Sequence, residues 1–341
     1  MRLGMGLALM NPGNRPDHEA YRDSLALADL AEPLGFHSIW TVEHHFTGHS
    51  PVPNPLQLLA YVAARTTRIE LGTAVLVLPW HDPLRVAEEI AVLDVLSGGR
   101  TTIGFGRGRS EIEYAGFGVN PQEGHARLAE GIDFVRRALT EDPLHYAGKF
   151  YHCAGLSVRP RPLHQPERGF HGAAHSAASA TLVGAAGLRL IFSPETDEGF
   201  TDGVLRAHRD AATAAGHQPG PSSAHLYVCV DTDRRRAFDR ARRYMTPMVE
   251  SLARHYQARP HQILSPADPD PEETTDAVSQ FMAKHVVGTP QECVDKLARL
   301  GERFDIGQFI GEFSYGGMPV DEARENVTLF AAEVLPALTD A

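Results

Sequence analysis

Short apolar runs alternate with longer stretches of helical periodicity along most of this chain. The run from Ser38 to Val42 is apolar, follows a helical stretch that stops at Gly35, and is too short to be a helix of its own. Such a run is typical of a buried parallel strand. Strands are predicted over residues 3–10, 38–43, 69–77, 101–105, 169–173, 189–192, 225–230 and 306–313.

Helical stretches are predicted between these strands. Asn54 and Pro55 suit the cap and the first position of one of them. The predicted helices cover residues 17–34, 55–65, 83–96, 122–140, 176–187, 199–216, 233–256 and 320–335. Repeated β-α units imply a parallel sheet, and eight of them favour an α/β fold with one closed (β/α)8 (TIM) barrel domain over residues 1–341. The alternative is an open doubly wound sheet, but its Gly-x-Gly-x-x-Gly fingerprint is missing after the first strand.

Two segments interrupt this repeat. The sequence pattern over residues 144–158 predicts a β-hairpin around Ala147-Gly148-Lys149. Residues 257–275 are polar and rich in proline, and they are irregular in pattern. A long irregular stretch in a compact barrel is often a lid. We therefore expect a mobile lid insertion there.

Composition narrows the possible partners and location. The formal net charge is −11 and no Lys/Arg run appears, which argues against a nucleic-acid partner. Cys153, Cys229 and Cys293 are scattered, as expected in a reducing cytoplasm. The sequence shows neither a signal-peptide pattern nor an apolar run long enough for a membrane span. We expect a cytoplasmic protein.

Candidate chemistry begins at the end of the second predicted strand, in Glu43-His44-His45-Phe46. Active sites of (β/α)8 barrels lie at the carboxyl ends of the strands, and charged groups there indicate a cavity. The alternative is a pair of histidines that are solvated or satisfied in the core. A metal site is less favoured, because neighbouring strand residues point to opposite faces.

A second group of residues suggests a phosphate site. Ser176 and Ser179 stand at the start of a predicted helix, where free N–H groups and the helix dipole favour an anion. Arg107, between Gly106 and Gly108, offers a forked pair of donors. A helix cap and a surface ion pair remain the simpler interpretations of each alone. Together with the histidine pair, they favour a phosphorylated cofactor.

Several motifs now resemble the bacterial luciferase-like flavin-dependent monooxygenases in order and spacing. The similarity covers nearly the whole chain. The matching segments are 43–46, 71–79, 82–89, 93–100, 104–108, 174–187, 287–292 and 330–336.

The resemblance implies a barrel that binds reduced FMN and activates O2 through a flavin C4a-hydroperoxide to oxidise a small organic substrate. It implies that His44 is the catalytic imidazole, as a general base or as a hydrogen-bond donor. It also implies a phosphate site and a flavin-facing strand, often with a non-proline cis peptide. Cofactor-binding residues are then Glu43, Thr73, Ala74, Val75, Gly106, Arg107, His175, Ser176 and Ser179. The role of Glu43 among them stays open.

Aromatic and polar residues near the same strand ends suggest the substrate pocket. We expect it to contain Phe46, His45, Trp80 and Tyr114, with no metal. Two positions depart from the light-emitting luciferase subunit: Gly106 replaces a reactive cysteine, and His175 replaces a glutamate. The glycine is expected to open space over the flavin, and both changes argue against light emission.

Partners follow from the same resemblance. No nicotinamide site is evident, so a separate flavin reductase is expected to supply the reduced cofactor. A homodimer is expected as well. Two alternatives stay open: a deazaflavin-dependent oxidoreductase, and a non-catalytic flavin-binding subunit.

Overall fold

The computed structural model describes residues 1–218, 220–257 and 277–339. Within them, eight parallel strands form a closed ring in the order β9-β11-β1-β2-β3-β4-β7-β8, and β8 pairs with β9 to close it. This confirms the predicted (β/α)8 barrel. The ring strands are β1 (Arg2–Leu7), β2 (Ser38–Thr41), β3 (Glu70–Val77), β4 (Thr101–Gly106), β7 (His171–Ala173), β8 (Arg189–Phe192), β9 (Ser222–Val230) and β11 (Ile306–Glu312).

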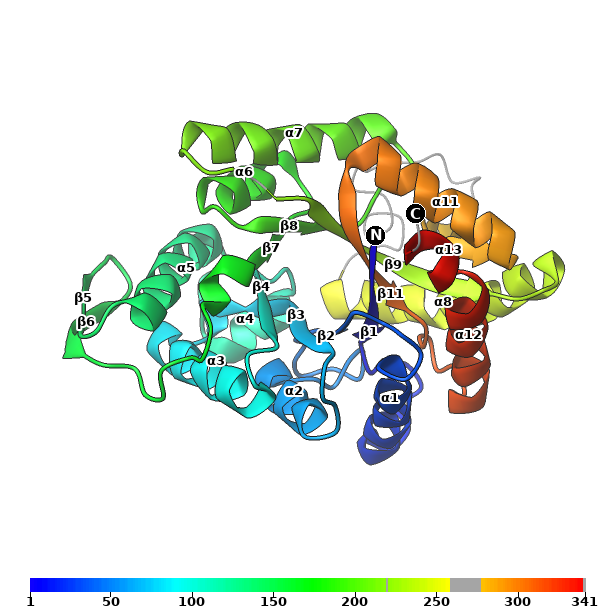
Figure 1. Ribbon diagram of the computed structural model, residues 1–341, viewed down its shortest axis with the longest axis horizontal. Coiled ribbons are helices and arrows are strands. Elements are labelled where there is room, and N and C mark those ends of the chain that lie inside the picture. Colours follow the sequence, from blue (N-terminus) through cyan, green and yellow to red (C-terminus); the bar gives the residue numbers. More distant parts are fainter. Residues whose placement is uncertain (219, 258–276, 340–341) are drawn as a thin grey trace.

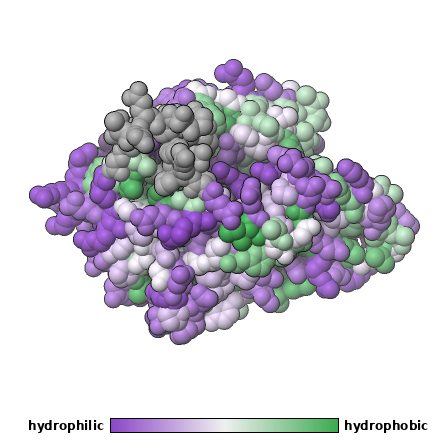
Figure 2. Space-filling model, turned by 180° about the vertical axis from the view of Figure 1, so that it is seen from behind, coloured by the Kyte–Doolittle hydropathy of each residue, from purple (hydrophilic) through white to green (hydrophobic). Residues whose placement is uncertain are grey.

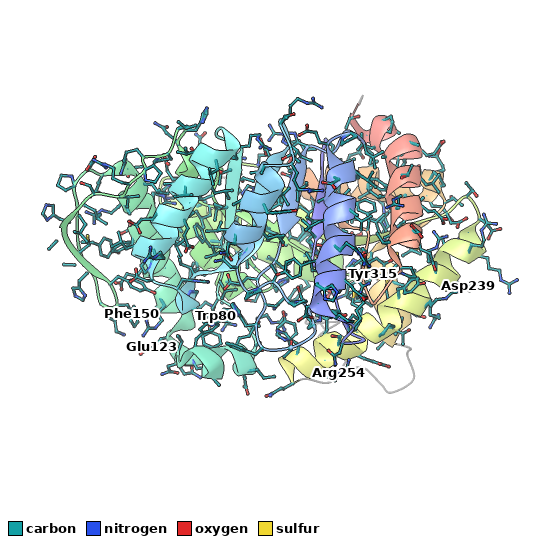
Figure 3. All side chains as sticks on the ribbon, turned by 90° about the horizontal axis from the view of Figure 1, so that it is seen from below. Trp80, Glu123, Phe150, Asp239, Arg254 and Tyr315 are labelled. Carbon is teal, nitrogen blue, oxygen red and sulfur yellow. The ribbon has the colours of Figure 1, made fainter. Side chains whose placement is uncertain are left out.

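Helices surround this ring (Figure 1). Asn54 caps α2 by accepting a hydrogen bond from the Gln57 N–H, and Pro55 is its first residue, as the sequence predicts. Seen from below, α3, α2, α1 and α12 lie side by side on one flank (Figure 3). The surrounding helices are α1 (Asp17–Ala31), α2 (Pro55–Ala63), α3 (Pro83–Ser97), α5 (Gly124–Thr140), α6 (Ala177–Ala185), α7 (Glu198–Ala214), α8 (Arg234–Tyr256), α11 (Pro290–Phe304) and α12 (Val320–Glu333).

Other elements go beyond the predicted repeat. Residues 144–158 contain the antiparallel pair β5 (Leu144–Ala147) and β6 (His152–Leu156). The short strand β10 (Val286–Gly288) pairs with the end of β9 outside the ring. The sequence analysis missed β10, α11 and the helices α4 (Glu111–Phe117), α10 (Ala277–Lys284) and α13 (Leu335–Thr339). The predicted lid falls almost wholly on residues 258–276, which lie outside the described residues.

Trp40 of β2 packs inside the barrel in a buried cluster with Ile191 and Ile310. A Cβ atom on Gly72 of β3 would lie 2.5 Å from this indole ring, and one on Gly4 of β1 would lie 2.9 Å from it. Glycine on both flanking strands therefore makes room for the ring, which is 1% exposed. The indole N–H donates to Ser38 Oγ at 2.8 Å, so the buried polar atom is satisfied.

The outer surface seen from behind is largely hydrophilic, with small hydrophobic patches (Figure 2). None of the helices in the described residues has both the length and the apolar composition that a membrane span requires.

Candidate functional site

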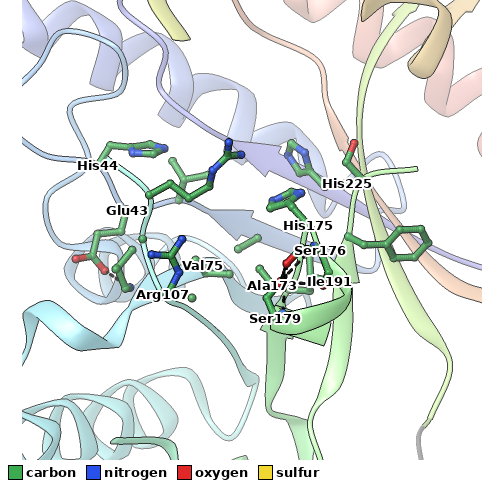
Figure 4. A pocket seen from close by; sticks show the side chains of 18 of the residues that line it. Glu43, His44, Val75, Arg107, Ala173, His175, Ser176, Ser179, Ile191 and His225 are labelled. Atoms are coloured by element: carbon green, nitrogen blue, oxygen red, sulfur yellow. Dashed lines mark hydrogen bonds between the residues drawn. The ribbon is translucent and has the colours of Figure 1, made fainter. Parts of the chain in front are cut away.

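A cavity of about 400 Å³ opens at the carboxyl ends of the barrel strands (Figure 4). This volume lies within the ordinary range for small-molecule and cofactor sites. Every segment that the sequence analysis singled out after strands β2, β3, β4 and β7 contributes to it. The predicted residues that line it are Glu43, His44, Ala74, Val75, Trp80, Gly106, Arg107, His175, Ser176 and Ser179.

One side of the cavity is suited to an anion. Ser176 caps α6 in a reciprocal pair with Ser179, and the start of this helix lines the cavity with Ser176, Ala178 and Ser179. Arg107 faces them across the cavity (Figure 4). His125 lines the same cavity, and burial together with the positive charge of Arg107 lowers its pKa. The simple cap interpretation of Ser176 is therefore correct, and it is compatible with an anion site.

A second side of the cavity is apolar. The Ala74–Val75 peptide bond of β3 is cis, as the resemblance implies. Ala173 and Ile191 line the cavity as well. The expectation that Gly106 opens space is corrected here, because a Cβ at this position would lie 2.3 Å from Val75 Cγ2. Because Gly106 has no side chain, the side chain of Val75 can pack against β4.

Two buried carboxylates line the cavity, and the first is Glu43, whose side chain is fully buried. It accepts hydrogen bonds from His45 Nε2 at 2.9 Å, His81 Nε2 at 2.6 Å and the Val77 N–H at 2.7 Å. We call Glu43, His45 and His81 the wall cluster. Burial alone would raise the pKa of the Glu43 carboxyl, but the hydrogen bonds from His45 and His81, the charge of His81 and the Val77 N–H hold it below its ordinary value.

This arrangement answers the open question about Glu43. The residue borders the cavity, yet its carboxylate is occupied by three donors from the protein. Glu43 stays a predicted residue of the cofactor site through its place in the cavity lining, and its carboxylate ties the end of β3 to the loop after β2.

The second buried carboxylate is Glu113 of α4, which is 1% exposed. Its Oε1 atom lies 3.2 Å from His44 Nδ1, 3.4 Å from His255 Nε2 and 2.8 Å from the His45 backbone N–H. We call Glu113, His44 and His255 the cavity cluster. Burial tends to raise the pKa of Glu113, but its contacts with His255 and His44 lower it to about 2.

Tertiary contacts assemble the cavity cluster from three distant segments. Ser110 Oγ, at the start of α4, donates to the His255 carbonyl at 3.1 Å and so fixes the end of α8. His255 Nδ1 lies 2.8 Å from Thr47 Oγ1, in the loop that carries His44. The rings of His44 and His255 are 4.8 Å apart. The loop after β2, the helix α4 and the end of α8 thus meet at one carboxylate.

Four predicted site residues lie away from the cavity, which corrects their assignment. The Thr73 hydroxyl is fully buried and bonds both to the carbonyl and to the N–H of Gly104, joining β3 to β4. Tyr114 donates to the Arg107 carbonyl at 2.5 Å. His45 belongs to the wall cluster, and Phe46 is 60% exposed and packs on Phe117. Of the predicted substrate residues, Trp80 alone lines the cavity.

The sequence analysis also missed residues that do line the cavity. Arg109 stacks on Tyr256 with its guanidinium carbon 5.2 Å from the ring centre. The other missed lining residues with polar side chains are Glu113, His125, Ser193 and His225. They lie on or next to α4, α5, α8, β8 and β9 and share no local motif, although the positions of Arg109 and Ser193 just beyond the ends of β4 and β8 were a usable signal.

Comparison with known proteins gives one consistent family. The sequence profile described as luciferase-like monooxygenase matches residues 1–305. The alkanal monooxygenase alpha chain of Photorhabdus luminescens is 25% identical over 100% of this chain and 98% of its own. The 4-hydroxyprotoasukamycin monooxygenase of Streptomyces nodosus subsp. asukaensis is 37% identical over 47% of this chain and 44% of its own. Several curated relatives are thus matched over about half of their length.

Solved structures agree on the fold. A monooxygenase from Streptomyces bottropensis superimposes with a TM-score of 0.87 and 28% identity, covering 99% of this chain and 100% of the other. An F420-dependent secondary alcohol dehydrogenase in complex with an F420-acetone adduct superimposes with a TM-score of 0.78 at 18% identity, covering 99% of each chain. At that identity the second likeness concerns the fold alone.

Proposed function

This chain belongs to the luciferase-like monooxygenase family, and from that premise we propose that it is an FMN-dependent monooxygenase acting on a small organic substrate. In this proposal a separate reductase supplies the reduced flavin, and O2 is the second substrate. Bound reduced FMN would supply the electrons that activate O2. The observation that carries the proposal is the cavity that combines a side suited to an anion, an apolar side and the imidazole of His44.

The residues of this cavity suit the two ends of FMN. The start of α6, with Ser176 and Ser179, and the side chain of Arg107 would hold the phosphate. The wall at Ala74, Val75 and Gly106 would lie against the ring system. His44 would hold or accept a proton near the reacting atoms. The apolar walls around the site would exclude water.

Two relatives support the choice of cofactor and partner. A flavin-dependent trigonelline monooxygenase of Acinetobacter baylyi, whose name calls it the oxygenase component, is 33% identical over 43% of this chain. A camphane monooxygenase solved in complex with FMN has the same fold. The word component supports a separate reductase for this chain. The names of these relatives do not agree on one substrate, so the proposed substrate is a small organic compound without further detail.

The phosphate assignment can be tested by measuring the affinity of oxidised FMN and riboflavin through flavin fluorescence. Arg107→Ala should weaken FMN binding by about ten- to a hundred-fold and riboflavin binding much less, because only FMN carries the phosphate. The exposed Arg85 of α3 provides the control Arg85→Ala. Equal loss of both flavins would contradict a phosphate at Arg107. Binding of a deazaflavin but not of FMN would favour the deazaflavin-dependent alternative.

A homodimer is part of the same proposal. Large apolar side chains are exposed on the adjacent helices α2 and α3, namely Tyr61, Val92, Val95 and Leu96. A second copy of the chain that covers this surface would remove them from water. Light scattering after size exclusion should give twice the chain mass for the wild type and one chain mass for Leu96→Lys. An unchanged mass for that variant would exclude this surface as the interface.

A further inference from the structure

We infer that Glu113 is the positioning residue for His44: it keeps the proton of the neutral imidazole on Nδ1, so that Nε2 meets the flavin cavity as a proton acceptor. The inference rests on the proposed function for its role in turnover, but the geometry that supports it does not depend on a bound flavin.

The first support is the chemistry of the contact. An ionised carboxylate accepts hydrogen bonds and cannot donate them. His44 Nδ1 lies 3.2 Å from Glu113 Oε1, so this nitrogen must carry the hydrogen. The tautomer of a histidine is set by the hydrogen bond made by one of its two nitrogens. The pKa of about 2 for Glu113 keeps the carboxylate ionised near neutral pH.

The second support is the direction of the His44 ring. The ring is 18% exposed, lines the cavity, and extends toward it from the loop after β2 (Figure 4). With Nδ1 turned to Glu113, Nε2 is the nitrogen left for a ligand. The sequence analysis left His44 as a base or as a donor, and in the inferred tautomer Nε2 is the base.

The third support is how firmly Glu113 itself is held. The same Oε1 atom accepts the His45 backbone N–H at 2.8 Å and faces His255 Nε2 at 3.4 Å.

Other titratable and charged groups surround the rings of His44 and His255. The titratable and charged groups facing His44 from the packed elements are Glu113 of α4, His49 of its own loop, and His255 and Tyr256 of α8, with Arg254 and Arg109 next to them.

A metal ion is the competing interpretation of the same residues. The nitrogen and oxygen atoms of the cavity cluster lie within 4.8 Å of one another, and two imidazoles with one carboxylate can bind zinc. The geometry favours a proton, because His44 Nδ1 meets Glu113 Oε1 in a hydrogen bond and that oxygen already accepts a backbone N–H.

The test is the protonation state of His44 in flavin-free protein, followed by nitrogen NMR of ¹⁵N-labelled histidine, with His44 assigned through His44→Asn. In the wild type at high pH, Nδ1 should be protonated and Nε2 bare. Glu113→Gln keeps an acceptor but loses the charge, so the tautomer should persist. Glu113→Leu removes the acceptor, and the proton should move to Nε2.

Glu111→Gln, on the exposed face of the same helix, is the matched control and should leave the tautomer of His44 unchanged. A wild-type His44 with its proton on Nε2, or a tautomer that is unchanged in Glu113→Leu, would overturn the inference. Stoichiometric Zn²⁺ binding by calorimetry that Glu113→Gln abolishes would overturn it too, because Nδ1 would then carry a metal. If the tautomer is as stated but FMN does not bind, the proposed function fails and the assignment of Glu113 stands.

Discussion

The wall cluster and the cavity cluster contain the same kinds of chemical group but differ in whether their imidazoles line the cavity. In each, one buried carboxylate meets two imidazoles and one backbone N–H. Both imidazoles of the wall cluster, His45 and His81, lie outside the cavity lining, whereas His44 of the cavity cluster belongs to it. The difference teaches that a carboxylate–histidine pair becomes a candidate for catalysis only when one ring nitrogen is left facing a ligand site.

Neighbouring residues in the sequence are divided between the two clusters. Glu43 and His45 belong to the wall cluster, and His44 between them belongs to the cavity cluster. The backbone of His45 nevertheless donates to Glu113. This alternation follows from extended backbone, in which successive side chains point to opposite sides. The two clusters therefore share one short segment, and substitutions in it can separate their roles.

The largest expected effect is on stability, in the wall cluster. Glu43→Ala leaves the buried His45 and Val77 N–H, and the half-buried His81, without their acceptor. Loss of one partner in such a buried charged group costs about 3–5 kcal/mol of unfolding free energy. Urea denaturation of the flavin-free protein should show this loss, with Glu111→Ala as the surface control. A change below about 1 kcal/mol would mean that the wall cluster does not stabilise the fold.

The second prediction compares the two clusters by their effects on turnover and on stability. His44→Ala should lower turnover, measured as product formed with reduced FMN and O2, by roughly a hundred-fold, the usual scale of acid–base catalysis. Flavin binding should stay close to that of the wild type. His45→Ala should instead lower the unfolding free energy and change turnover much less. If His45→Ala lost as much turnover as His44→Ala at equal flavin occupancy, the division between the clusters would be wrong.

The smallest effect is the acid sensitivity of the cavity cluster. The folded-state pKa of Glu113, about 2, lies below its ordinary value of 4.5. Its contribution is therefore present above pH 4.5 and is lost as the pH falls toward 2. Between pH 6 and pH 3, the wild type should lose about 2 kcal/mol of unfolding free energy that Glu113→Gln does not lose. Parallel pH profiles of the two proteins in urea denaturation would contradict the lowered pKa.

The sequence by itself determined the barrel and much of the cavity. The alternation of short apolar runs with helical stretches predicts the ring, because each strand needs one buried face and each helix one apolar side. Residues just after β2, β3, β4 and β7 were found from this order alone, since parallel strands bring their carboxyl ends to one edge. His44, Arg107, Ser176 and Trp80 line the cavity for that reason.

Only the tertiary structure decided which side chains face a ligand and which face the protein. Glu43 and Glu113 are both acidic residues near strand ends, yet the helix α4 and the end of α8 must be placed before Glu113 can be linked to His44. Helix α4 has only seven residues, and one of them is Gly116, so its helical pattern was too weak to predict. His255 lies 211 positions from His44 in the sequence, and no local pattern records a contact over that separation.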